Sequence, residues 1–169
     1  MHFLSTLEQM PFSIWVRESS SIWAFPTFLV VHTIGMSIVA GLSAMMSLVI
    51  LGFWPNVPIR PLERLFPMIW IGFWINAVTG TVLLIADATT KLTNWDFGVK
   101  MAFVFAGVWL ITRTRKRVFG SPQLDHGSLP VGSKGLAWAS LICWFGAITA
   151  GRLLAYLGPV SGLSGVTNK

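Results

Sequence analysis

The chain has 169 residues, of which 54% are hydrophobic and only 11% are charged. Soluble domains carry about 25% charged residues, so this sequence lacks the polar surface that a soluble domain of its length needs. Its net charge of +6 does not indicate nucleic-acid binding, because the cations lie between apolar runs rather than along one basic face. The single cysteine, Cys143, excludes an intrachain disulfide and a Cys-x-x-Cys metal site.

The first segment, residues 1–21, is more polar than the long apolar runs after it. It has no basic leader, and Glu8 and Pro11 interrupt it before any long apolar core, so we do not expect a cleavable signal peptide. Ser5 and Glu8 have the spacing of a capping box, and apolar residues then recur at roughly helical spacing. We therefore predict a short amphipathic helix, or a pair of turns, over residues 4–18 on the membrane surface.

Four apolar runs come next, and each is long enough to cross a bilayer as a helix. The hydrocarbon core of a bilayer is about 30 Å thick and needs about 20 helical residues, whereas the strands of a membrane barrel are far shorter. The predicted spans cover residues 22–53, 66–86, 97–112 and 136–157. The predicted fold class is all-α, a polytopic membrane four-helix bundle over residues 22–158 with a tail over residues 159–169.

The cations between the spans predict the orientation of the chain. Seven cations follow the first and third spans, and four lie on the other side; the seven are Arg60, Arg64, Arg113, Arg115, Lys116, Arg117 and Lys134, and the four are Arg17, Lys91, Lys100 and Lys169. Lys and Arg are enriched in cytoplasmic loops. We therefore predict an inner-membrane protein with both termini in the periplasm. The connection from Val118 to Gly135, which contains His126, is expected to be a mobile cytoplasmic loop.

Ionisable residues inside the spans are the first candidates for a site, because each costs about 2.5–3.5 kcal/mol on insertion scales. With the predicted orientation, Asp87, Lys100 and Arg152 converge near the outer end of the bundle. One interpretation is a structural polar cluster of these three residues with Asn76, in which the acid pairs with the cations. The other is that Lys100 and Arg152 hold an anion or the carboxylates of a cofactor.

His32 is the best candidate ligand in the sequence, and it precedes Met36 by one helical turn. Imidazole and thioether groups ligate haem iron and copper, so the candidate cofactor-binding residues are His32, Met36, Lys100 and Arg152, with haem b or copper as the cofactor. The alternative is a histidine that only hydrogen-bonds to a neighbouring helix. The spans hold only one histidine. A haem site would therefore have to be completed by Met36 or by another subunit, or the iron would have to be five-coordinate.

Small residues in the second span predict which face of that helix touches protein. Gly72, Asn76 and Gly80 follow one another at four-residue steps, and such stripes let membrane helices approach closely. We expect this stripe to face His32 and Gly35 of the first span. No catalytic residues are predicted, since the sequence has no phosphate-binding loop, nucleophile elbow or zinc-protease motif.

Four stretches together resemble a family of small bacterial four-helix inner-membrane proteins grouped as a domain of unknown function. These stretches are IWAFPTFLVVHTIGMSIVAG, WIGFWINAVTGTVLLIADA, FGVKMAF and WFGAITAGRLLAYLG, and the resemblance covers about Ser21 to Gly158. The histidine and spaced glycines of the first span are more distantly similar to copper-resistance membrane proteins and small b-type cytochromes. The stretch WLITRTRKRV lacks the histidine that some of these proteins have there, which is unfavourable to ligation by two histidines.

The resemblance implies no activity, but it supports the emphasis on His32, Asp87, Lys100 and Arg152. The first expected function is an integral subunit of a redox- or metal-linked membrane complex, with a haem or copper site near His32. One alternative is a non-catalytic scaffold or assembly subunit, and another is a small transporter or lipid-binding protein. The expected partners are the lipid bilayer and other membrane subunits or a second copy of the chain, and we do not expect enzymatic activity from the isolated chain.

Overall fold

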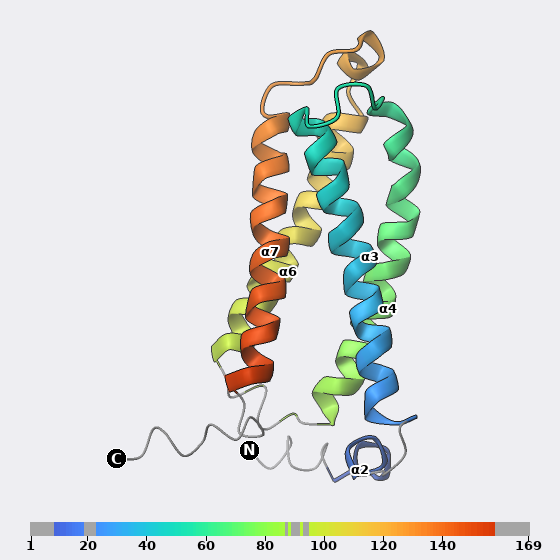
Figure 1. Cartoon of the computed structure of the whole chain (residues 1–169), viewed down its shortest axis with the longest axis vertical. Coiled ribbons are helices and arrows are strands. Elements are labelled where there is room, and N and C mark those ends of the chain that lie inside the picture. Colours follow the sequence, from blue (N-terminus) through green and yellow to red (C-terminus); the bar gives the residue numbers. More distant parts are fainter. Residues whose placement is uncertain (1–8, 19–22, 87, 89–91, 93–94, 158–169) are drawn as a thin grey trace, which may run out of the picture.

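The computed structural model describes residues 9–18, 23–86, 88, 92 and 95–157, and its regular elements in these ranges are all helical. Four long α-helices form a bundle (Figure 1), and all four are long and apolar enough to cross a membrane. They are α3 (Phe25–Leu51), α4 (Phe66–Ile85), α6 (Trp95–Thr114) and α7 (Ser133–Leu157), and a short helix, α2 (Pro11–Glu18), precedes them. The predicted fold class, an all-α four-helix bundle, is confirmed.

The four helices are arranged as two hairpins. Helix α3 packs along α4, α6 packs along α7, and the hairpins meet mainly where α3 contacts α7. Residues 52–65 connect α3 to α4 and residues 115–132 connect α6 to α7, so both connections lie at the same end of the bundle, which we call the connection end. The first and the last of the four long helices, α3 and α7, are therefore in contact.

Local signals explain where α3 begins and ends. Pro26 occupies its first turn, where the backbone needs no hydrogen-bond donor. Gly52 has a φ of 95°, a left-handed conformation that glycine adopts without steric cost, and it ends the helix. The backbone N–H of Phe53 then donates to the carbonyl of Leu48 at 3.1 Å, which satisfies one of the last helical carbonyls.

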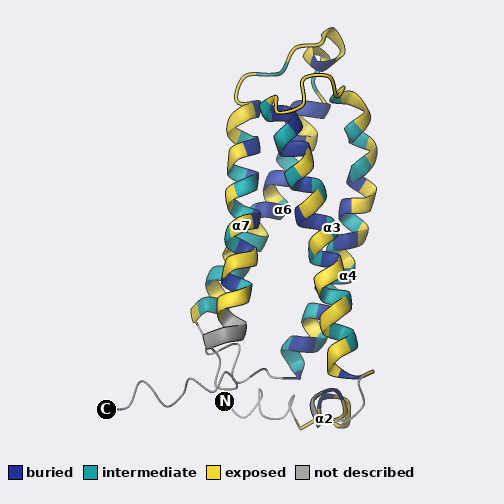
Figure 2. Ribbon diagram, in the orientation of Figure 1, coloured by how far each residue is buried: buried dark blue, intermediate teal, exposed yellow. Residues whose placement is uncertain are grey.

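The buried core is weighted toward the connection end. In α6 the buried positions, Gly107, Leu110, Ile111 and Thr114, all lie in the second half of the helix. Figure 2 shows buried positions on the sides of the helices that face one another and exposed positions along their outer sides. Many exposed side chains are large and apolar, for example Phe145 with 75% exposure. Such an apolar outer surface suits contact with lipid, as expected for a multi-pass membrane protein.

Short helical turns order the connection end. They are η1 (Arg60–Leu65), the π-helical turn η2 (Arg115–Phe119) and η3 (Pro122–His126). Val118, Phe119 and Leu124 are buried, and Phe119 packs edge-on against Phe66 with ring centroids 5.2 Å apart. The predicted loop from Val118 to Gly135 thus begins with helical turns whose apolar side chains complete the core.

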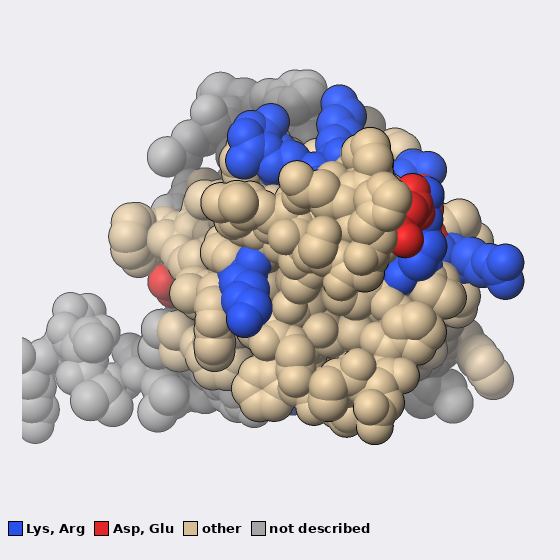
Figure 3. Space-filling view, turned by 90° about the horizontal axis from the view of Figure 1, so that it is seen from above, with Lys and Arg blue, Asp and Glu red and all other residues tan. Residues whose placement is uncertain are grey.

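Arg60 joins the two connections. Its Nη1 donates to the carbonyl of Phe119, and its Nε lies 3.3 Å from Oδ1 of Asp125. Glu63, three residues further on, lies 3.7 Å from Nη1. Figure 3 looks onto this end and shows Lys and Arg side chains around its edge, with acidic side chains beside one cationic group. Asp125 thus links the two connections through Arg60, whereas Glu63 pairs with Arg60 within η1.

Candidate functional site

His32 lies where α3 contacts α4, so its predicted orientation toward a neighbouring helix is confirmed. Its Nδ1 is 3.0 Å from the carbonyl oxygen of Asn76 and 3.2 Å from Oγ1 of Thr79. The Thr79 hydroxyl donates to the carbonyl of Ile75 at 2.7 Å, which leaves its oxygen as an acceptor toward the imidazole. The ring is therefore held by α4 at two points, both on one turn of that helix.

These partners define the tautomer of the imidazole. A backbone carbonyl can only accept a hydrogen bond, so the contact with Asn76 requires the proton to be on Nδ1. In the neutral ring the lone pair is then on Nε2 of His32. In this tautomer Nε2 is the basic nitrogen of the ring, the type of atom that coordinates metals.

Glycines on both helices make room for this arrangement. A Cβ at Gly80 would lie 2.9 Å from Cε1 of His32, too close for any other residue without movement of the ring. A Cβ at Gly35 would lie 2.8 Å from the backbone nitrogen of Asn76. A Cβ at Gly72 would lie 2.7 Å from Cγ2 of Ile38. The stripe Gly72–Asn76–Gly80 thus faces α3, as its spacing predicts.

Asn76 contributes more than its carbonyl. Its side-chain Oδ1 is buried and has no hydrogen-bond partner among the described residues. A buried acceptor left in this way costs about 1–3 kcal/mol. The α3–α4 contact therefore contains one buried acceptor, Oδ1 of Asn76, that receives no hydrogen bond from the described residues.

Met36 is one turn from His32 on α3. It is partly buried and packs against the core cluster that includes Val39 and Ala40 of the same helix. The thioether is therefore part of the bundle packing, on the side of α3 that continues into the core.

The predicted outer cations belong to the other hairpin. The side chain of Lys100 extends along α7, since a Cβ at Gly151 would lie 3.5 Å from its Cε and 3.7 Å from its Nζ. Arg152 is the next residue and is exposed. Lys100 thus contacts α7 at the residue before Arg152, on the α6–α7 pair, whereas His32 and Asn76 belong to the α3–α4 pair. Asp87 lies outside the described residues, so its pairing with these cations stays a prediction.

Two features limit what the site does by itself. Among residues 9–18, 23–86 and 95–157 no group of three or more His, Cys, Asp or Glu side chains gathers as a metal site. His126 is exposed on η3 at the connection end and is not part of the His32 surroundings. A metal held by His32 would therefore need ligands beyond the His, Cys, Asp and Glu side chains of the described residues.

Sequence reasoning missed Thr79 as a partner of His32. The signal was present, because Thr79 is three residues after Asn76 and next to Gly80, on the face that is predicted to meet α3. A threonine in a membrane helix usually satisfies its own hydroxyl on the preceding turn, as Thr79 does, so its second contact depends on the packing.

The fold and its surface define the class: this is a multi-pass α-helical membrane protein with a histidine held between its first two long helices. Comparison with models of known families, with curated proteins and with solved structures finds no match to this chain.

Proposed function

We propose that the chain is an integral subunit of a redox- or metal-linked complex in the bacterial inner membrane, in which His32 supplies one ligand to haem iron or copper. The observation that carries this proposal is the hydrogen bond from Nδ1 of His32 to the carbonyl of Asn76. Ligating histidines almost always donate their other ring N–H to a carbonyl or carboxylate, which orients the ring and raises the basicity of the ligating nitrogen.

The proposed site is shared. His32 is one ligand, and Met36 is the nearest thioether on the same helix, of a kind that suits Cu(I) or a haem axial position. We propose a second copy of the chain or another membrane subunit as the source of the remaining ligands, because His126, the other histidine in the described residues, is on η3 at the connection end. For a haem, Lys100 and Arg152 are the cations that would hold its propionates.

Three substitutions test ligation by the visible spectrum and metal content of the protein purified from its native membrane. His32→Asn keeps an amide N–H near the position of Nδ1 and removes Nε2, whereas His32→Ala removes both. We expect bound iron or copper to fall about tenfold or more in both variants, because each lacks the ligating atom. His126→Ala is the matched control and should leave the metal content unchanged.

A wild-type protein purified without haem or copper, or a His32→Asn variant with full metal content, would contradict ligation. Loss of metal from His126→Ala as strongly as from His32→Asn would also contradict it, since it would locate the ligand at the connection end. Retained helicity by circular dichroism in His32→Asn separates loss of a ligand from loss of the fold.

The second candidate is a non-catalytic scaffold or assembly subunit, and the close approach of Gly35 to the backbone of Asn76 favours it. On this reading His32 is one interhelical hydrogen bond, and such bonds are worth about 0.6 kcal/mol on average in membrane proteins. His32→Ala would then lower stability slightly and His32→Asn would behave as the wild type. The cavity between the four helices, about 20 Å³, is too small for a transported ligand, and the outer polar residues on which the transporter alternative depends include Asp87, which lies outside the described residues.

The proposed orientation places Arg113, Arg115 and their neighbours in the cytoplasm and both termini in the periplasm. The reason is the excess of cations at the connection end, where Arg115, Lys116 and Arg117 are all exposed. Reporter fusions check it. A cytoplasmic reporter joined after Gly127 and a periplasmic reporter joined after Leu157 should both be active, and the reverse pattern would invert the proposed topology.

A further inference from the structure

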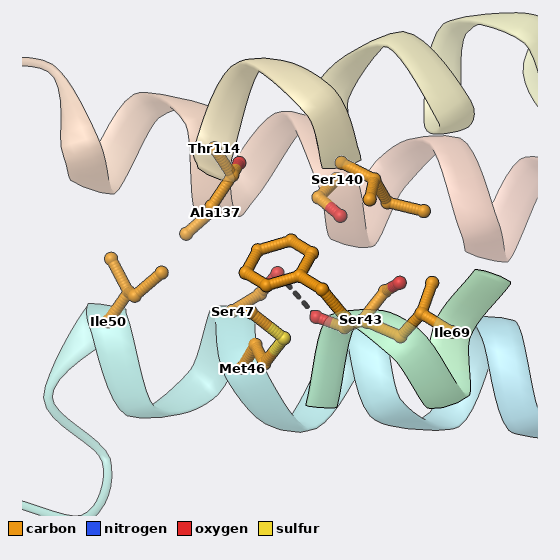
Figure 4. A pocket seen from close by; sticks show the side chains of 10 residues that line it. Ser43, Met46, Ser47, Ile50, Ile69, Thr114, Ala137 and Ser140 are labelled. Atoms are coloured by element: carbon orange, nitrogen blue, oxygen red, sulfur yellow. Dashed lines mark hydrogen bonds between the residues drawn. The ribbon is translucent and has the colours of Figure 1, made fainter. Parts of the chain in front are cut away.

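A small cavity lies in the middle of the bundle, where α3, α4, α6 and α7 meet toward the connection end. Its volume is about 20 Å³, and it is separate from the His32 contact because none of the residues around His32 lines it. Apolar side chains such as Met46 and Phe66 form part of its wall. Figure 4 shows the cavity from close by, with side chains from the facing helices directed into the space between them.

Hydroxyl groups make up the rest of the wall. They come from Ser43 and Ser47 of α3, Thr114 of α6 and Ser140 of α7. All four residues are buried; Ser43 is 4% exposed and Ser140 is 5% exposed. In Figure 4 the hydroxyls of Ser43 and Ser140 point from opposite sides toward the space between α3 and α7. A purely apolar packing defect would not collect polar groups from three helices.

The hydroxyls differ in what they already bind. The Ser47 hydroxyl donates to the carbonyl of Ser43 at 2.7 Å, within α3. The Ser43 hydroxyl is buried and has no hydrogen-bond partner in the described part of the chain. In membrane helices a serine ordinarily donates to the carbonyl one turn earlier, as Ser37 does to Thr33 at 2.8 Å. Ser43 instead directs its hydroxyl into the cavity.

We infer that this cavity binds one water molecule, which hydrogen-bonds to Ser43 and links α3 to α7 through Ser140 or to α6 through Thr114. Size and chemistry agree: a water molecule needs a cavity of about 10–15 Å³ and two to four polar partners, whereas cavities that remain empty are apolar. A larger ligand does not fit. The water molecule thus connects the two hairpins. In the membrane interior lipid offers no hydrogen bond, so the hydroxyl of Ser43 would otherwise remain unpaired there.

Water-edited solid-state NMR of the protein in bilayers of deuterated lipid tests this directly, with water itself as the probe. Serine and threonine are labelled, and magnetisation is transferred from water to the protein. We expect early transfer to Ser43 and Ser140. Thr149 is the control on the same helix as Ser140, because it is exposed on the outer face and its hydroxyl donates to the carbonyl of Phe145 at 2.8 Å. It should show no early transfer.

The substitution Ser43→Val distinguishes a hydrated cavity from a dry one. Valine fills the space with methyl groups and removes the hydroxyl, so it displaces the water and leaves Ser140 without it. The transfer to Ser140 should disappear, and the thermal unfolding midpoint should fall by about 2–4 °C. In a dry cavity the same change fills a void and raises the midpoint. Thr149→Val, which replaces a hydroxyl by a methyl on the outer face, should leave the transfer to Ser140 intact.

Two results would overturn the inference: wild-type protein without early transfer to Ser43 and Ser140, or a Ser43→Val protein that is more stable than the wild type. If Ser43→Val does not fold, the wild-type transfer measurement still decides, because it needs no variant.

Discussion

Alanine at position 35 is expected to lower the free energy of unfolding by about 1–3 kcal/mol, the usual cost of adding atoms to a well-packed contact. The added Cβ would lie 2.8 Å from the backbone nitrogen of Asn76 and 3.0 Å from the carbonyl oxygen of Gly72. Both are backbone atoms, so the clash is relieved only if α3 and α4 move apart. That movement would also lengthen the hydrogen bond from His32 to Asn76, so the effect reaches the proposed site.

Gly41→Ala is the matched control, since a Cβ at Gly41 on the same helix would have no neighbour within 4 Å. Alanine favours a helix over glycine by up to about 1 kcal/mol, so this variant should be as stable as the wild type or slightly more stable. Unfolding in mixed micelles, followed by circular dichroism, measures both. Equal stability of Gly35→Ala and Gly41→Ala would mean that α3 and α4 do not approach this closely.

Trp144→Ala is expected to be the most disruptive change in the α6–α7 pair. Trp144 is 3% exposed, and its ring lies 3.0 Å from the position that a Cβ on Gly107 would take. Loss of a buried tryptophan costs about 3–5 kcal/mol in soluble proteins. We expect about 2–3 kcal/mol here, because lipid instead of water surrounds the separated helices and only the packing contacts are lost.

Two companion variants separate packing from polarity. The Nε1 of Trp144 is buried without a hydrogen-bond partner in the described residues, so Trp144→Phe keeps an aromatic ring and removes an unpaired polar group. It should lose much less stability than Trp144→Ala. Trp138→Ala, at a residue that is 54% exposed on the same helix, should be close to neutral. A similar loss for all three would show that Trp144 does not anchor the α6–α7 contact.

The sequence predicts the helices well because length and hydropathy determine them, but the ends are less exact. The fourth span is predicted from residue 136 and α7 begins at Ser133, since the helix includes Lys134 and Gly135 in its first turn. Hydropathy does not mark such a turn, because its side chains are polar or absent. The third helix likewise extends beyond its apolar run, from Trp95 to Thr114.

The parts of the candidate site that follow from the residue spacing along one helix could be predicted. Contacts between segments far apart in the sequence could not. The four-residue steps of Gly72, Asn76 and Gly80 indicated the face that contacts α3. No local pattern indicated that Arg60 would reach Phe119, because both lie in connections without helical periodicity. The hydroxyl-lined cavity was missed for a related reason: isolated serine and threonine residues in apolar helices are typical of packing, and only the fold brings those of α3, α6 and α7 together.

The π-helical turn η2 has a consequence for the end of α6. Because its hydrogen bonds span five residues, each residue advances around the axis by a smaller angle than in an α-helix. Three consecutive residues, 115–117, therefore stay on the outside, and the next two, Val118 and Phe119, both turn inward. The number of residues in this turn therefore determines which side chains face the core, whereas the choice of Lys or Arg at each outer position does not. Removing one residue would rotate Phe119 away from Phe66, whereas arginine in place of Lys116 would leave both rings where they are.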